Sequence, residues 1–200
     1  MAAADYNKNT MANALDLKPG NFFQMDGDIY TVLSAVHTHQ QQRRGVVRIK
    51  ARQMRSGKTV EFVWRSDERV EDVVIEETAL TFLYRDTAGF HFMDEATYEQ
   101  VTFPEEVVGD AVRYLKENLS VTGLMYGGRP IGIRVPFFVD LKVVEAEPGF
   151  KGDTVQGGRK RAVLETGLAV QVPLFIQKGD TVRIDTRTDE YLTRTASNET

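Results

Sequence analysis

Short runs in which apolar and polar residues alternate fill most of this 200-residue chain, and they constrain its fold more than any other feature. The runs at Val46–Arg55 and Thr59–Arg65 show the pattern well. Because successive side chains of a strand point to opposite faces, each run suits a strand with one buried face. The dipeptides Asp26-Gly27 and Ser56-Gly57 are typical hairpin turns between such runs. The sequence therefore predicts a mainly all-β protein.

The order of the runs divides the chain into three small units after a leader. Residues 1–12 are small, polar and aperiodic, which predicts a disordered leader. Residues 13–74 predict an SH3-like barrel of about five strands, the last near 73–75. Residues 75–136 follow the strand and helix order of an OB-fold, and residues 137–200 form a further unit that is mainly β.

One segment of the second unit predicts a helix. Thr102–Glu105 has the form of a capping box with a proline near the helix start. Apolar residues then recur at helical spacing at Val107, Val108, Ala111, Val112 and Leu115.

Composition excludes several classes of protein. The chain has no cysteine, so disulfide and thiol chemistry are excluded. Neither an apolar run long enough to span a bilayer nor a signal-peptide core near Met1 is present, so we expect a cytoplasmic protein without a membrane partner. The sequence contains no Gly-x-Ser-x-Gly elbow and no dinucleotide fingerprint, and we expect no enzyme, cofactor or small-molecule substrate. His37 and His39 are too few for a metal site.

Basic residues gather around the stretch HTHQQQRRGVVR, residues 37–48, although the net charge of the whole chain is −4. From Arg43 to Lys58, both included, there are seven basic residues and no acidic one. On a strand, Arg48, Lys50 and Arg52 would form one external row. Such a row is expected of a phosphate-binding surface, whereas the alternative is an ordinary solvated strand face.

A glycine-rich stretch, residues 152–158, lies between runs of the third unit. It lacks the Gly-Lys-Ser/Thr ending of a phosphate-binding P-loop. Two interpretations stay open: a flexible connection, or a loop in which Asp153 and Thr154 hydrogen-bond to a nucleic-acid backbone.

Several motifs resemble one protein family. Residues 160–179, KRAVLETGLAVQVPLFIQKG, are similar to the C-terminal signature of bacterial elongation factor P. The stretches PGFKGDT, IDTRTDEYLTR and LTFLYRDTAGFHFMDEATYEQ also resemble that family, and the likeness covers roughly residues 13–195. The signature positions are matched by Lys160, Ala162, Gly167, Val172, Pro173 and Gly179.

This resemblance implies a fold and a function. It implies an SH3-like (KOW-type) barrel followed by two OB-folds, in an L-shaped outline similar to tRNA. It implies a monomer that binds the ribosome between the P and E sites, with ribosomal RNA and peptidyl-tRNA as partners. Such a factor promotes peptide-bond formation on ribosomes stalled at consecutive prolines by stabilising the peptidyl-tRNA.

The resemblance also implies roles for particular residues. A third-domain loop and two C-terminal residues of the family meet RNA, and they correspond to Gly152, Asp153, Thr154, Tyr191 and Arg194. The tip loop, residues 37–45, reaches towards the peptidyl-transferase centre with Gln40, Gln41, Gln42, Arg43 and Arg44.

The tip departs from the family pattern at Gln42, where the family usually carries a modified lysine or arginine. Gln42 has no amine to acylate. Three hypotheses follow: the tip works unmodified, with Gln42 donating and accepting hydrogen bonds; Arg43 is the modified residue in a loop shifted by one position; or the chain is a divergent paralogue. We favour the first hypothesis.

Two further functions remain open. The OB-folds could form a general binder of single-stranded nucleic acid, with grooves and stacking aromatic residues. Alternatively, the chain is a regulatory paralogue that binds ribosomes without rescuing them.

Overall fold

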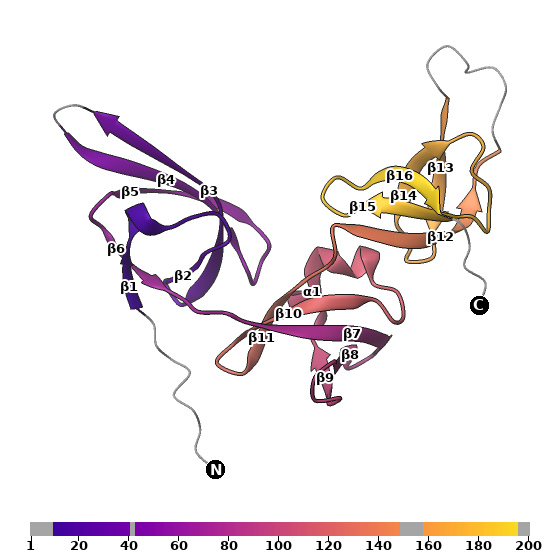
Figure 1. The fold of residues 1–200 in the computed structure, drawn as a ribbon, viewed down its shortest axis with the longest axis horizontal. Helices are drawn as coiled ribbons and strands as arrows, with labels where there is room; N and C mark the ends of the chain where they lie inside the picture. The colour runs from indigo at the N-terminus through magenta and orange to yellow at the C-terminus, as the bar shows by residue number, and fades with distance from the viewer. Residues whose placement is uncertain (1–9, 41–42, 149–157, 196–200) are drawn as a thin grey trace. The chain divides into compact units, whose positions relative to one another are not determined.

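The structure is a computed structural model that describes residues 10–40, 43–148 and 158–195. Its strands form three sheets, one of six strands and two of five, so the mainly all-β fold class is confirmed (Figure 1). The expectations for Gln41, Gln42, Gly152, Asp153 and Thr154 lie outside the described residues.

The first sheet has the strand order β1-β6-β2-β3-β4-β5. Its strands are β1 Thr10–Asn13, β2 Phe22–Met25, β3 Asp28–Gln40, β4 Arg43–Gln53, β5 Thr59–Arg65 and β6 Arg69–Asp72, and a 3-10 turn, η1, spans Ala14–Asp16. Apolar and polar residues alternate along strands such as β4 and β5, and the inward-facing positions of the sheet carry the large aromatic rings that form the core. The Phe23 ring stacks on Tyr30 at 5.3 Å and meets the edge of Trp64 at 5.3 Å.

Two expectations for this sheet are wrong. Residues 10–12 were predicted as part of a disordered leader, but they belong to β1, which pairs antiparallel with β6. Apolar and polar residues do not alternate along β1. Backbone pairing with β6 holds this strand in place, together with a hydrogen bond from the Arg69 guanidinium to the Met11 carbonyl oxygen at 3.3 Å. The last strand was expected near 73–75, but β6 spans Arg69–Asp72. With β1 added, the sheet has six strands instead of about five.

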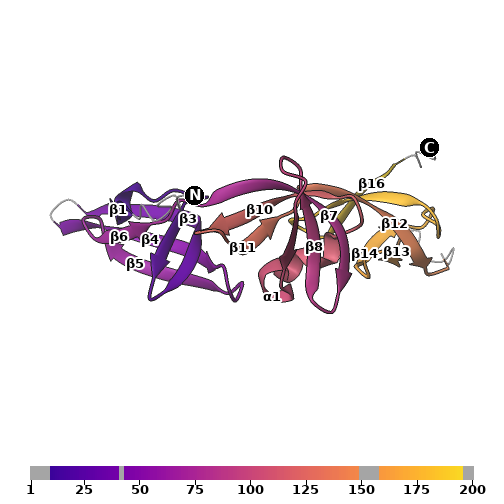
Figure 2. The ribbon, with the colours of Figure 1, turned by 90° about the horizontal axis from the view of Figure 1, so that it is seen from below.

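The second sheet has the strand order β11-β10-β7-β8-β9, and Figure 2 labels its strands β7, β8, β10 and β11. Its strands are β7 Glu76–Asp86, β8 Gly89–Asp94, β9 Gln100–Phe103, β10 Ser120–Tyr126 and β11 Arg129–Arg134, with α1 Glu105–Val108 and the 3-10 helix η2 Gly109–Tyr114 between β9 and β10. The expected order of three strands, a helix and two strands is confirmed.

The helix itself is shorter than predicted. The α-helix has four residues and stops at Gly109, whose φ of 54° lies in the left-handed region. The remaining apolar residues therefore follow a 3-10 helix. The capping box is absent because Pro104 occupies the N-cap and no side chain caps it. The Glu105 carboxylate instead accepts a hydrogen bond from Arg85 at 2.8 Å.

The third sheet has the strand order β14-β13-β12-β15-β16. Its strands are β12 Phe138–Ala146, β13 Arg159–Leu164, β14 Ala169–Pro173, β15 Thr181–Asp185 and β16 Glu190–Thr195. Every second residue of β12 as far as Val143 is buried, at Val139, Leu141 and Val143, and these side chains pack in the core of this sheet. The alternation predicted for this segment is confirmed.

The chain divides into two compact units. The first contains residues 1–78 and 123–132, and the second contains residues 79–122 and 133–200. Within the described ranges no helix is both long and apolar enough to cross a membrane.

Candidate nucleic-acid interface

The long hairpin of β3 and β4 carries the predicted tip loop (Figure 1). The two strands pair from Tyr30 opposite Gln53 as far as Gln40 opposite Arg43. Most of the segment 37–45, predicted as a loop, is therefore strand, and that expectation is wrong in its extent. Backbone pairing does not require apolar side chains, so a polar sequence extends the hairpin as well as an apolar one.

The basic row on β4 is confirmed as an exposed strand face. Val47, Ile49 and Ala51 are fully buried. The side chains between them, at Arg48, Lys50 and Arg52, are exposed. The strand period of two therefore separates core from charge as the sequence predicts.

Glu61 on β5 modifies the electrostatics of this row. It lies directly opposite Lys50 in the strand register, and its carboxylate is 3.5 Å from the Arg48 guanidinium. In the register, Arg48 lies between Val36 on β3 and Val63 on β5, and each valine is 57% exposed. The face thus combines partly neutralised positive charge with exposed apolar side chains.

At the tip, only the backbone of certain predicted residues is described. Gln40 ends β3, and Arg43 and Arg44 begin β4. The roles expected for the five tip side chains, and for a modification at Arg43, stay predictions.

Of the predicted residues in the third sheet, Tyr191 and Arg194 both belong to β16. The Tyr191 side chain is half-buried against the core of the sheet. The Arg194 guanidinium lies 3.7 Å from the Asp180 carboxylate and is 53% exposed. Arg194 therefore keeps most of its surface available to an anion, whereas Tyr191 offers only part of its ring.

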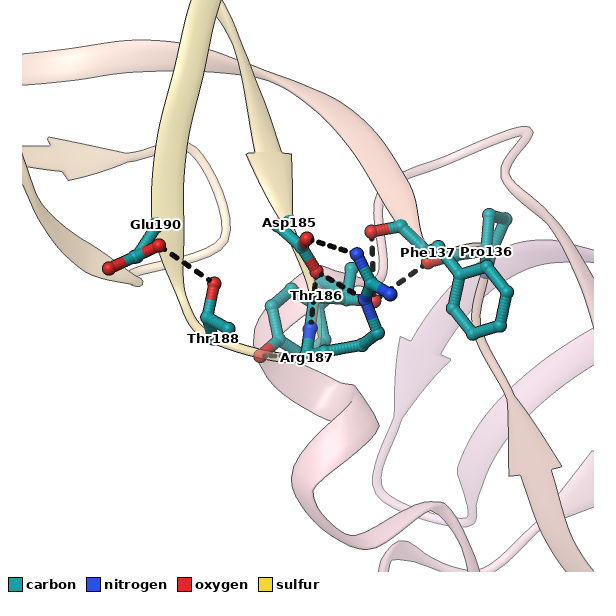
Figure 3. Close-up of polar contacts among 8 residues, drawn as sticks. Pro136, Phe137, Asp185, Thr186, Arg187, Thr188 and Glu190 are labelled. Carbon is teal, nitrogen blue, oxygen red and sulfur yellow. Dashed lines mark hydrogen bonds and ion pairs between the residues drawn. The ribbon is translucent and has the colours of Figure 1, made fainter.

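A second cluster near this sheet had no predicted role. The Arg187 guanidinium pairs with the Asp185 carboxylate, with Nε donating to Oδ1 at 2.9 Å (Figure 3). It also lies over the rings of Phe137 and Phe138 at 5.1 and 5.7 Å. Contact with Arg187 lowers the pKa of Asp185 to about 2. The sequence did contain a signal for this cluster, namely two adjacent phenylalanines directly after a proline. Successive side chains of a strand point to opposite faces of the sheet, so the two rings cannot both be buried in the core.

Sequence reasoning also missed a histidine–carboxylate pair in the second sheet. His91 is buried, and its Nε2 lies 2.8 Å from Asp86 Oδ1, an ion-pair distance without the alignment of a hydrogen bond. Contact with His91 lowers the pKa of Asp86. The Tyr84 ring stacks on the imidazole at 4.5 Å, and Gln100 Nε2 lies 2.8 Å from Nδ1. This enclosure suits a structural role for His91.

Comparison with known families covers almost the whole chain. Residues 13–70 match the Elongation factor P (EF-P) KOW-like domain, residues 75–133 the Elongation factor P (EF-P) OB domain, and residues 139–194 the Elongation factor P, C-terminal model. Proteins named Elongation factor P from Moorella thermoacetica and Coprothermobacter proteolyticus are each 45% identical over 92% of this chain, and the matches cover 100% and 99% of those proteins.

A solved structure shares the fold. Eukaryotic translation initiation factor 5A from Methanococcus jannaschii superposes with a TM-score of 0.53 at 20% identity, over 68% of this chain and 100% of that one. The matched KOW-like, OB and C-terminal domains define a translation elongation factor. The chain belongs to the elongation factor P family.

Proposed function

We propose that this chain binds the ribosome between the P and E sites and promotes peptide-bond formation on ribosomes stalled at consecutive prolines. Its partners would be ribosomal RNA and peptidyl-tRNA. The contribution is positional, because holding the tRNA end restores a reactive geometry without a covalent step by the protein. Family membership supports this proposal.

The observation that carries the proposal is the exposed basic row of β4, Arg48, Lys50 and Arg52, on the hairpin that leads to the tip. Each basic side chain that neutralises a phosphate releases a condensed counterion. RNA binding by this row should therefore weaken steeply as salt rises. The buried side chains on the opposite face of β4 fix the spacing of the row.

For the tip we propose that Gln42 works without modification. An amide side chain both donates and accepts hydrogen bonds, which suits contact with an RNA backbone or base edge. Intact-mass measurement of the native protein, with peptide mapping of residues 37–48, tests this. An added mass on Arg43 would contradict the unmodified tip.

For the third sheet we propose that Arg194 contributes a phosphate contact, together with Tyr191 and the loop residues Gly152, Asp153 and Thr154. The pair of Arg194 with Asp180 is long, at 3.7 Å, and its Arg194 side chain is 53% exposed, so it can open on binding, because solvent-accessible pairs contribute about 0–1 kcal/mol.

The test is a reconstituted translation system that reads a reporter with three consecutive prolines. We expect the native chain to relieve stalling and the double variant Lys50→Gln with Arg52→Gln to relieve it less. The salt slope for ribosome binding of the variant should be shallower by about one for each phosphate that the row no longer neutralises. Lys18→Gln, an exposed lysine away from the row, is the matched control and should behave as the native chain.

The outcomes separate the candidate functions. Unchanged stalling with the native chain bound to ribosomes would indicate a regulatory paralogue. Unchanged stalling with binding only to free oligonucleotides would indicate a general single-strand binder. Either result overturns the proposal.

A further inference from the structure

A cavity of about 320 Å³ lies within the second unit, beside the start of β10 and the segment after β11. This volume is at the small end of the roughly 300–1,000 Å³ that small-molecule sites span. The lining mixes apolar and polar groups and includes Ala79, Glu95, Ser120, Val121, Val135 and Phe137.

Phe137 forms an aromatic wall that the structure holds in place. Thr186 fixes its backbone, since the Thr186 amide donates to the Phe137 carbonyl oxygen at 2.9 Å (Figure 3). The Arg187 guanidinium lies over the ring at 5.1 Å and is itself held by Asp185. The side chain nevertheless stays 59% exposed. Because the Phe137 ring is held in position and remains exposed to solvent, it can stack against a planar group of a ligand.

Glu95 supplies a fixed acceptor in the same cavity. Its Oε1 accepts hydrogen bonds from the hydroxyl groups of Thr81 at 2.8 Å and Ser120 at 2.9 Å. Within the described part of the chain, Oε2 accepts no hydrogen bond that would occupy it. A carboxylate oriented through one oxygen therefore presents its second oxygen to a donor.

We propose that this cavity takes one unstacked nucleobase of single-stranded RNA, stacked on Phe137, with an exocyclic amino group of the base donating to Glu95. A planar ring backed by a cation suits a base, because stacking on aromatic side chains accepts any base. An apolar peptide side chain would leave the carboxylate without a donor. The inference rests on the proposed function for its biological RNA and adds a base-binding site to it.

Glu95 makes the site selective. Cytosine, adenine and guanine carry an exocyclic amino group, whereas uracil presents carbonyl oxygens in its place. A carboxylate accepts from the amino group and repels the carbonyl oxygen. The cavity should therefore discriminate against uracil.

The test titrates the full chain with two RNAs that differ in one base, UUCUU and UUUUU, followed by amide shifts in NMR spectra. We expect shifts at Thr122 and Val135, which both line the cavity, and about tenfold tighter binding of UUCUU, because one hydrogen bond to a charged group decides between the two RNAs.

Three variants separate stacking from base selection. Phe137→Ala should weaken binding of UUCUU about fivefold or more, the loss of one stacked base. Glu95→Gln should bring the ratio between the two RNAs close to one, because a glutamine amide can also donate to uracil. Phe175→Ala removes another exposed phenylalanine, outside the cavity lining, and should leave both affinities unchanged.

Equal binding of the two RNAs by the native chain, shifts confined to other residues, an equal loss in Phe175→Ala, or displacement of the RNA by an apolar peptide would each overturn the base site. These measurements need no ribosome. A chain that selects UUCUU but leaves the three-proline reporter unchanged keeps the base site and overturns the proposed function, and the converse result overturns only the base site.

Discussion

The Arg48 guanidinium on β4 lies 3.5 Å from the Glu61 carboxylate on β5, and the two side chains are 62% and 57% exposed. Glu61 also lies opposite Lys50 in the strand register. One acidic residue thus adjoins two of the three cations in the basic row. An exposed pair of this kind contributes only about 0–1 kcal/mol to stability, so its main effect is on the charge of the face.

We therefore expect Glu61→Gln to tighten ribosome binding. Glutamine keeps the size of the side chain and frees Arg48 for a phosphate. The slope of log K against log salt should steepen by up to about 0.9 for each phosphate newly neutralised. The measurement is ribosome binding between low and physiological salt. Glu117→Gln, an exposed acid of the second unit, is the control, and equal or weaker binding by Glu61→Gln would show that the row does not meet phosphate.

A second prediction concerns Tyr114, at the end of η2. Its ring is buried, and its hydroxyl lies 3.0 Å from the Thr186 carbonyl oxygen and also contacts the Asp189 carboxylate. Tyr114→Phe removes this donor from a partly buried carbonyl oxygen and from a carboxylate. We expect the free energy of unfolding to fall by about 1–3 kcal/mol. Urea unfolding checks this value, and Tyr98→Phe, at a 75% exposed tyrosine, should change it little.

The same tyrosine gives the third prediction, a pH dependence. Burial, and then contact with Asp189, raises the pKa of Tyr114 from 10.0 to about 12. Because the pKa is higher in the folded state, the stabilising contribution is complete below pH 10 and is lost between pH 10 and about 12. The stability difference between the native chain and Tyr114→Phe should therefore shrink as pH rises through this window. A difference that is constant from pH 8 upward, measured in urea, would contradict the assigned pKa.

How well the sequence predicts the structure of a segment depends on which interaction determines the conformation of that segment. Burial decides β4, and the alternation of residues 47–52 correctly separates core from charge. Backbone geometry determines the length of the helix after Pro104. The α-helix ends at Gly109, although apolar residues continue beyond it at the spacing of a longer helix. Pairing partners far away in sequence decide β1, which no local pattern marks.

The candidate sites divide in the same way. The basic row follows from the strand period alone. The wall formed by Phe137 depends on Arg187, about fifty residues further along the chain, and on the turn between β15 and β16 that brings the two together. The adjacent phenylalanines indicate that one ring is exposed, but no local sequence pattern identifies Arg187 as the partner of Phe137.

The last prediction concerns Gly89, the first residue of β8. Its φ is 138°, and a Cβ at this position would lie 2.5 Å from the Phe103 carbonyl oxygen on β9. Gly89→Ala therefore meets both an unfavourable backbone conformation and a clash with backbone that cannot move without disturbing the β8–β9 pairing. We expect a loss of about 3 kcal/mol or more in the free energy of unfolding, the sum of backbone strain and overpacking.

The matched control is Gly57→Ala, at a turn glycine with φ of 68°, where an added Cβ would have no atom within 4 Å. At Gly57 only the backbone strain applies, and we expect the free energy of unfolding to fall by about 1 kcal/mol. Chemical unfolding of both variants measures the difference, which combines the close approach of β8 to β9 with the greater backbone strain at a φ of 138°. Equal losses in the two variants would mean that the second sheet relaxes at Gly89 and that Phe103 does not limit the size of the residue there.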